Sequence, residues 1–342
     1  MVKERKVDLV GVGLNATDTL IHLSTFPESG SKVEYEAEAI LPGGQVATTV
    51  VACQTWGLST RYVGKLGDDD ASRLHAREFL RVGTEAHLIN VPNTPSARSL
   101  ILVDRSGERT VLCRRDERLV LQPAELKREW IVNARALHVD GHDTAAATVA
   151  ARWAREAGVL VTADLDDPYA GIHELLRNID YLIVNHDFPF RLTGEPDLKT
   201  ALREMQRRFG SRIAAATLGH DGVLAWDGRQ FHYAAAFRVP VANTTGAGDI
   251  FRAGFIYGLL QGWTLPRCLD FSCAAAAINC MAEGARGGIC SVDQVESFMA
   301  STPRYKPVED YAAFVDTAQE HAATIPQTTA PSKCGSPCGD LR

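Results

Sequence analysis

Several features that mark other classes of protein are absent from this 342-residue sequence. No apolar run reaches about 18 residues, the length that a helix needs to span a bilayer, and the first residues lack the apolar core of a signal peptide. No Cys-x-x-Cys pair occurs among the eight cysteines, six of which are scattered through apolar segments as small hydrophobes. We therefore expect a cytoplasmic protein in a reducing compartment, without a membrane partner.

Common catalytic and nucleic-acid motifs are also missing. The sequence has no Gly-Lys-Ser/Thr of a Walker A loop, no His-Arg-Asp of protein kinases and no Gly-x-Ser-x-Gly elbow. A formal charge of −6 and the lack of a Lys/Arg block argue against a nucleic-acid partner. A hydrophobic content of 45% is ordinary for a globular protein and leaves room for a large core.

Buried strand patterns alternate with helical patterns through most of the chain. Strands are expected over 134–140, 159–164 and 179–185, and helices over 143–157 and 198–209. This alternation predicts an α/β fold with a doubly wound, mostly parallel sheet that carries helices on both faces.

Two β-rich segments interrupt this pattern, and we expect them to pair into a small sheet standing off the core. The predicted parts are an α/β core (1–13, 41–96 and 119–321), a β lid (14–40 and 97–118) and a disordered tail (322–342). The apolar face of such a lid needs a cover, which can be a substrate, a second subunit or both.

The stretch from Asn243 to Phe255 is the strongest candidate for a catalytic site. Its sequence, Asn-Thr-Thr-Gly-Ala-Gly-Asp, leads into an apolar helical pattern. The amides of residues 246–248 can converge at the helix N-terminus, where they favour an anion. Asp249 lies in the same turn and can take a proton, which suits phosphoryl transfer. The plain alternative is a glycine turn followed by a helix that begins with an acid.

Polar residues also gather where the expected parallel strands end. Asp140, Asp164, Asp166 and Asn185 lie at such ends, where open α/β sheets bind ligands and where acids can hold Mg²⁺ through water. The segment 138–142, His-Val-Asp-Gly-His, resembles a metal cluster but lacks a fourth ligand.

Three further patterns bear on ligands. The loop Thr217–Gly222 has two glycines that could approach a nucleotide phosphate, although a hairpin turn explains it equally well. The segment 11–16, Gly-Val-Gly-Leu-Asn-Ala, partly matches a dinucleotide fingerprint but lacks the helix that should follow. Arginines gather on the second lid segment, and one or two of them could bind an anionic substrate group; the candidates chosen are Arg98 and Arg114.

Together these pieces resemble the ribokinase-like, or PfkB, carbohydrate kinase family over residues 7–300. Residues 42–69, with Pro-Gly-Gly and Gly-x-x-Gly-Asp-Asp, look like its N-terminal signature, and residues 243–254 look like its C-terminal one. The resemblance implies an ATP- and Mg²⁺-dependent kinase with a small-molecule sugar substrate, a doubly wound core and a β lid of a kind that often pairs as a homodimer clasp.

The resemblance also implies roles for individual residues. Asp249 would be the base, and the amides of Gly246, Ala247 and Gly248 would form the anion hole. The residues on the sugar side would include Asp18, Gly43, Gly44 and Thr48. The residues on the ATP side would be Asn185, Thr217, Gly219, Gly222 and Asn279, with Asn185 and Asp187 near Mg²⁺ through water.

Three positions depart from the family pattern. Asn243 replaces the usual Asp, which leaves a monovalent-cation site open. Phe188 replaces a Glu, and Thr48 replaces a sugar-binding Asn, which favours a ketose or an acidic sugar over ribose. The alternatives to a sugar kinase are a nucleoside kinase of the same family, an NAD-dependent oxidoreductase based on the segment 11–16, and a non-catalytic sugar or nucleotide sensor.

Overall fold

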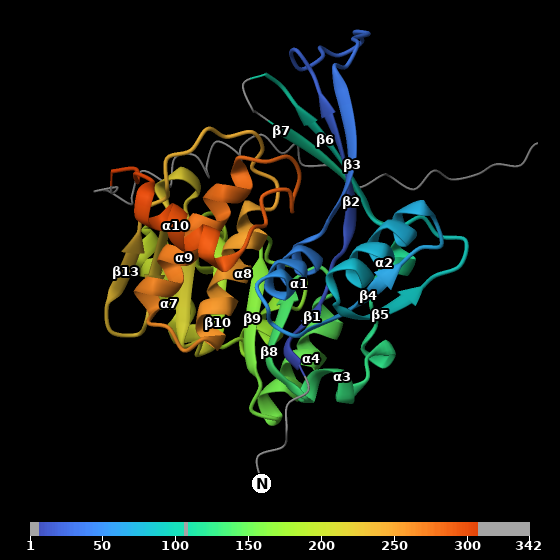
Figure 1. Ribbon diagram of the computed structural model, residues 1–342. Helices are drawn as coiled ribbons and strands as arrows, with labels where there is room; N and C mark the ends of the chain where they lie inside the picture. The colour runs from blue at the N-terminus through green and yellow to red at the C-terminus, as the bar shows by residue number, and fades with distance from the viewer. Residues whose placement is uncertain (1–6, 106–108, 307–342) are drawn as a thin grey trace, which may run out of the picture.

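The computed structural model describes residues 7–105 and 109–306. In those two ranges the strands form two sheets, a large one at the centre of the α/β core and a small one that projects from it (Figure 1). No helix in the same ranges is long and apolar enough to cross a bilayer. The predicted disordered tail, with Cys334 and Cys338, lies outside the described residues.

The large sheet contains nine of the described strands, in the order β13-β12-β11-β10-β9-β8-β1-β4-β5. Their bounds are β1 (Val7–Val12), β4 (Thr60–Leu66), β5 (Glu85–Asn90), β8 (Ala134–Asp140), β9 (Leu160–Leu165), β10 (Tyr181–Asn185), β11 (Ile213–Thr217), β12 (Val223–Trp226) and β13 (Phe231–Ala234). All pairs from β11 to β5 are parallel, whereas β12 and β13 extend one edge in antiparallel fashion. The predicted mostly parallel sheet is therefore confirmed.

Helices cover both faces of this sheet, which is why most of its parallel strands are continuous buried apolar runs. One face packs against α3 (Arg128–Val132), α4 (Thr144–Glu156), α5 (Ile172–Leu176), α6 (Phe188–Thr193) and α7 (Leu198–Phe209). The other packs against α1 (Gln45–Thr55), α2 (Asp70–Val82), α8 (Ala247–Leu260), α9 (Leu265–Cys280) and α10 (Val292–Ser301). Short 3-10 turns occur at Glu117–Leu119, Pro123–Glu125 and Gly219–Asp221.

Local sequence explains where several helices begin and end. The Asp69 carboxylate accepts a hydrogen bond from the Ser72 amide at 3.2 Å and caps α2, and Gly83 ends that helix in the left-handed conformation, at φ 86°. Asp197 caps α7 in the same way through the amide of Thr200. These caps fix the helices that flank the sheet edges.

The small sheet, called the lid from here on, has the strand order β3-β2-β6-β7. Its strands are β2 (Ala16–His22), β3 (Ala37–Gly43), β6 (Arg98–Val103) and β7 (Arg109–Arg114). β2 and β6 pair in parallel at its centre, and the outer pairs are antiparallel. The two segments that were expected to pair, one on each side of β4 and α2, therefore do so, around a small core of Leu20, Ile101 and Val103. Figure 1 shows the lid rising above the core.

Some elements differ from expectation. β5 and α6 were not predicted. The glycines of the partial dinucleotide fingerprint, Gly11 and Gly13, allow neighbouring side chains to pack closely against the backbone. A Cβ on Gly11 would lie 2.4 Å from Val50, and one on Gly13 would lie 2.4 Å from the Asp140 carboxylate. Because β2 rather than a helix follows β1, the segment is no dinucleotide-binding turn.

Candidate active site

The loop 243–249 is held in place by contacts that require its particular residues. Gly246 precedes α8 with φ 75°, and a Cβ there would lie 2.4 Å from the Ala285 carbonyl oxygen. Asn279 fastens the loop, because its Nδ2 donates to the carbonyls of Thr245 and Ala285 at 3.2 Å each. Asn279 therefore stabilises the loop conformation. Its side chain lines neither of the two cavities described in the next paragraph.

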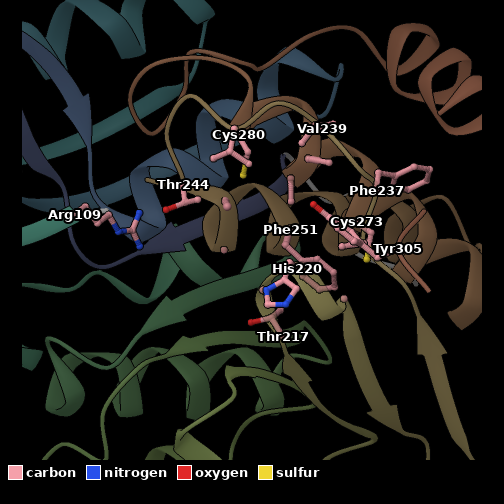
Figure 2. Close-up of a pocket in the computed structure, with 18 residues that line it drawn as sticks. Arg109, Thr217, His220, Phe237, Val239, Thr244, Phe251, Cys273, Cys280 and Tyr305 are labelled. Atoms are coloured by element: carbon pink, nitrogen blue, oxygen red, sulfur yellow. The ribbon is translucent and has the colours of Figure 1, made fainter. Parts of the chain in front are cut away.

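This loop separates two cavities. The first, called the lid cavity, has a volume of about 540 Å³ and lies between the lid and the core. Its wall includes Asp18, Gly44, Thr245, Gly246 and Asp249. The second, called the apolar cavity, has a volume of about 500 Å³ and is shown in Figure 2. Its wall includes Thr217, Gly219, Gly222, Ala247, Gly248, Phe237, Val239 and Phe251. Two residues predicted for the sugar and three predicted for ATP thus line opposite cavities, whereas Gly43, Thr48, Asn185 and Asn279 line neither.

The apolar cavity is shaped by the glycine loop after β11. Gly222 has φ 94°, and a Cβ there would lie 2.0 Å from the Ala234 carbonyl oxygen, so only glycine fits. Thr217 and His220 point into the cavity from this loop, while Phe237 and Val239 face them from the segment after β13 (Figure 2). Such a wall suits a flat aromatic ring with a few polar groups.

Asp249 lies in the first turn of α8, next to a second carboxylate. Burial and the nearby Asp164 raise the pKa of Asp249 well above its usual value. Arg252, one turn further along α8, opposes this rise: its Nε lies 2.8 Å from Asp164 Oδ1 and also donates to the Ile183 carbonyl at 3.2 Å. Burial raises the pKa of Asp164 to about 6. The site thus has one buried acid, Asp164, and one half-buried acid, Asp249, beside a buried arginine.

Asp18 faces the same cavity from strand β2. Its side chain is buried, and desolvation raises its pKa to about 6 even though a hydrogen bond from Ser99 and the charges of Arg286 and Arg109 oppose the rise. A Cβ on Gly43 would lie 2.1 Å from an Asp18 carboxylate oxygen. Gly43 is therefore glycine because the Asp18 carboxylate occupies the space beside it.

Arg286 is a site residue that sequence reasoning missed. Its side chain is only 6% exposed and forms an ion pair with Glu78 of α2. Its Nε donates to Thr48 Oγ1 at 3.1 Å, and its Nη2 donates to the Gly43 carbonyl at 2.8 Å. Two residues predicted to hold sugar hydroxyls are thus tied to this arginine. Arginines are seldom buried, so a single sequence gives no signal that would distinguish this one.

The register of the lid sorts its arginines by face. Arg98 pairs directly opposite Arg114, and both alternate with Ser99 and Cys113, which share the face of Asp18. Arg98 also forms an ion pair with Asp69 at 2.7 Å. On β7, Val111 and Arg109 follow Cys113 at intervals of two residues toward the turn. Their side chains therefore lie on the same face as Cys113. Arg98 and Arg114, the arginines chosen from the sequence, line the lid cavity, and so does Arg109, which the sequence analysis did not single out.

The predicted metal residues have other partners. Asn185 Oδ1 accepts a hydrogen bond from the Phe188 amide at 3.1 Å, and Asp187 Oδ1 lies 2.8 Å from His186 Nε2. His138 is fully buried against Thr162. In the part of the chain that the structure describes, no group of three or more His, Cys, Asp or Glu could hold a metal. The described residues thus bring together no transition-metal cluster, and the role of Asn185 and Asp187 near Mg²⁺ stays a prediction.

Comparison with known proteins agrees with this geometry. The pfkB family carbohydrate kinase profile matches residues 15–290. A 5-dehydro-2-deoxygluconokinase of Geobacillus thermodenitrificans is 25% identical over 296 residues, which cover 79% of this chain and 87% of that one. An ATP-dependent ribose-1-phosphate kinase of Halopiger xanaduensis is 28% identical over 292 residues, covering 83% and 95%. The crystal structure of a putative ribokinase from Agrobacterium tumefaciens has a TM-score of 0.80 at 25% identity, covering 86% and 97%.

The fold is thus that of the ribokinase-like kinases. The chain belongs to the pfkB family of carbohydrate kinases and is a phosphotransferase of that family. The resemblance predicted from the two signature segments is confirmed, and the alternative of an NAD-dependent oxidoreductase is not supported.

Proposed function

We propose that this protein transfers the γ-phosphoryl group of ATP to a hydroxyl of a small sugar or sugar derivative. The observation that carries the proposal is that the loop 243–249 forms part of the wall of both cavities. An acceptor in the lid cavity and a nucleotide in the apolar cavity would meet at that loop. The similarity to an ATP-dependent ribose-1-phosphate kinase supports ATP as the donor.

Each part of the loop then has a task. The amides of residues 246–248, at the N-terminus of α8, hold the charge that develops on the phosphoryl oxygens. Asp249 accepts the hydroxyl proton as the acceptor oxygen attacks phosphorus. Its raised pKa makes it a stronger base than an exposed carboxylate. Mg²⁺ would enter with the nucleotide phosphates, because Mg²⁺ commonly takes its ligands from substrate phosphates and water.

The acceptor would be held between lid and core. Asp18 can accept hydrogen bonds from sugar hydroxyls, Gly44 lies on the same cavity wall, and Gly43 leaves space for the Asp18 carboxylate itself. Arg286 fixes Thr48 and the Gly43 carbonyl, so it sets the shape of this end of the cavity. Positioning of this kind, together with charge stabilisation, is sufficient for phosphoryl transfer.

An isosteric substitution tests the proposal. Asp249→Asn should lower kcat by about 10²–10⁴-fold, the usual contribution of a positioned base, and should leave binding of the ATP analogue AMP-PNP intact. Asp293→Asn is a matched control, because Asp293 also lies in the first turn of a helix, α10, but is exposed. The measurement is coupled ADP release across sugars, sugar acids, sugar phosphates and nucleosides. Near-normal turnover by the Asp249→Asn variant would contradict the assignment.

We also propose that the lid pairs with the lid of a second copy. Ile40, Thr19, Leu100 and Leu112 form one row across its outer face, and Ile40 and Leu112 are 61% and 53% exposed. Apolar side chains on a sheet face need a cover. Sedimentation should therefore give a dimer that Leu112→Glu converts to monomer, and a wild-type monomer at micromolar concentration would contradict the idea.

A further inference from the structure

The apolar cavity has a single strong cation on its wall. Among the described residues that line it, Arg109 is the only lysine or arginine, and no Asp or Glu lines it. Arg109 belongs to β7 of the lid and also lines the lid cavity. In the described part of the chain, it is the only residue that the two cavities share. A side chain at this position lies where the two ligands of the proposed kinase meet.

The guanidinium of Arg109 reaches the loop that we assign to the phosphoryl group. Its Nη1 donates to Thr245 Oγ1 at 3.4 Å, a long hydrogen bond, and Thr245 directly precedes Gly246. Figure 2 shows Arg109 beside Thr244 at one end of the apolar cavity. Within residues 7–105 and 109–306, no ion pair and no second hydrogen bond engages this guanidinium. It is exposed and therefore available to a ligand.

The other described lid arginines do not line the apolar cavity. Arg105 pairs with Glu36 on the lid, and Arg115 donates to both oxygens of the Asp143 carboxylate at 2.8 and 2.9 Å. Arg98 pairs with Asp69, and Arg98 and Arg114 line the lid cavity but not the apolar cavity. Among the described residues, Arg109 is thus the one lid arginine that lines both cavities.

We propose that Arg109 is a catalytic residue whose guanidinium binds the γ-phosphoryl group during transfer, an inference that rests on the proposed kinase function. The acceptor oxygen forms a bond to the γ-phosphorus while the bond from that phosphorus to the β–γ bridging oxygen breaks. The electron pair of the broken bond leaves with ADP, and the hydroxyl proton goes to Asp249. Arg109 donates to the non-bridging oxygens of the transferring group, for which the planar guanidinium is well suited.

This role explains how the site manages without a Walker A lysine. Phosphoryl transfer spreads negative charge over the three equatorial oxygens, and a cation at that point stabilises the transition state. The loop amides supply only partial charges. Arg109 supplies a full charge from the opposite side of the junction, on the same sheet that covers the acceptor.

The test compares Arg109→Gln and Arg109→Lys with Arg105→Gln, whose arginine lies on the same lid but lines neither cavity. The acceptor is the compound with the highest kcat/KM in the ADP-release screen. Arg109→Gln should lower kcat by about 10²–10³-fold, as loss of one transition-state donor does, with little change in the KM for the acceptor. Arg109→Lys should recover part of the loss, because it keeps the charge and loses the fork geometry. Arg105→Gln should match the wild type.

Calorimetry with AMP-PNP and ADP gives a second measurement that does not depend on turnover. Arg109→Gln should weaken the binding of AMP-PNP and leave the binding of ADP unchanged, because only AMP-PNP carries a γ-phosphoryl group. An unchanged kcat would overturn the proposal, and so would a raised acceptor KM at constant kcat, which would make Arg109 an acceptor-binding residue. Equal losses for the two nucleotides would also overturn it. If none of the acceptors in the screen makes the wild type release ADP, the proposed function fails. The calorimetric comparison would still decide whether Arg109 binds the γ-phosphoryl group.

Discussion

Arg252→Met should show how much the buried positive charge of Arg252 contributes to stability and activity, because the substitution removes the charge and keeps a side chain of similar length. The substitution keeps a long side chain in α8 and removes the cation that Asp164 and Asp249 share. The Arg252 and Asp164 side chains are 5% and 3% exposed, so water cannot replace the lost partner. Removing one member of a buried ion pair costs about 3–5 kcal/mol, and we expect the free energy of unfolding to fall by that amount at pH 8.

The same substitution should change the pH dependence of activity in one direction. Arg252 lowers the pKa of both acids, so its loss raises both. Because Asp249 must be ionised to accept a proton, the acidic limb of kcat/KM should move to higher pH. The stability loss should shrink as pH falls toward about 6, the pKa of Asp164 in the presence of Arg252, and should disappear below it, because neutral carboxyls need no counterion.

Urea denaturation and ADP release, each measured from pH 5 to pH 9, provide the assay. Arg128→Met is the control, since Arg128 and Glu156 are 51% and 53% exposed and their ion pair is worth about 0–1 kcal/mol. An Arg252→Met variant as stable as the control would refute the buried-pair reasoning. An acidic limb that moved to lower pH would refute the proposed electrostatics of Asp249.

Two more predictions concern the walls of the cavities. Gly246→Ala should abolish most activity, because its Cβ would lie 2.4 Å from the Ala285 carbonyl and shift the loop. Gly262→Ala, at a similar φ of 74° with nothing within 4 Å, should cost only about 1 kcal/mol of stability and keep kcat. For Asp18, with a pKa of about 6, the acceptor KM should rise as pH falls below 6, because only the ionised carboxylate accepts hydrogen bonds at both oxygens. A KM that stays flat between pH 5 and pH 8 would argue against a role for Asp18 in acceptor binding.

The fold could be predicted from sequence wherever burial leaves a clear pattern. β8, β9 and β10 are nearly continuous apolar runs between helices, and they alone indicate a parallel sheet. β5 was missed because it is half-exposed at the sheet edge and reads Glu-Ala-His-Leu-Ile-Asn, without an apolar run. α6 was missed because it has only six residues and contains Pro189.

The site was predictable to the extent that local backbone geometry sets it. Glycines at 246 and 248 before an acid indicate an anion site at a helix start, and the structure places them between the two cavities. Arg98, Arg114 and Arg109 all line the lid cavity, but only Arg109 also lines the apolar cavity, and its placement depends on strand register and on how the lid packs against the core. The sequence analysis therefore chose Arg98 and Arg114 but had no signal for Arg109. The partners of Arg252 and Arg286 lie far away in sequence, so their burial could not be foreseen.

The parallel pairing of β2 with β6 at the centre of the lid has a consequence for folding. Asp18 can meet Ser99 only after α1, β4, α2 and β5, which lie between them in the chain, have been brought together. Contacts so distant in sequence form late, because the loop must close before they stabilise anything. Three buried apolar side chains form the core of the lid among its described residues. We therefore expect the lid to unfold locally more easily than the α/β core. A substitution that destabilises the core should therefore open the lid first. It would weaken acceptor binding in the lid cavity before it unfolds the part of the core around the apolar cavity.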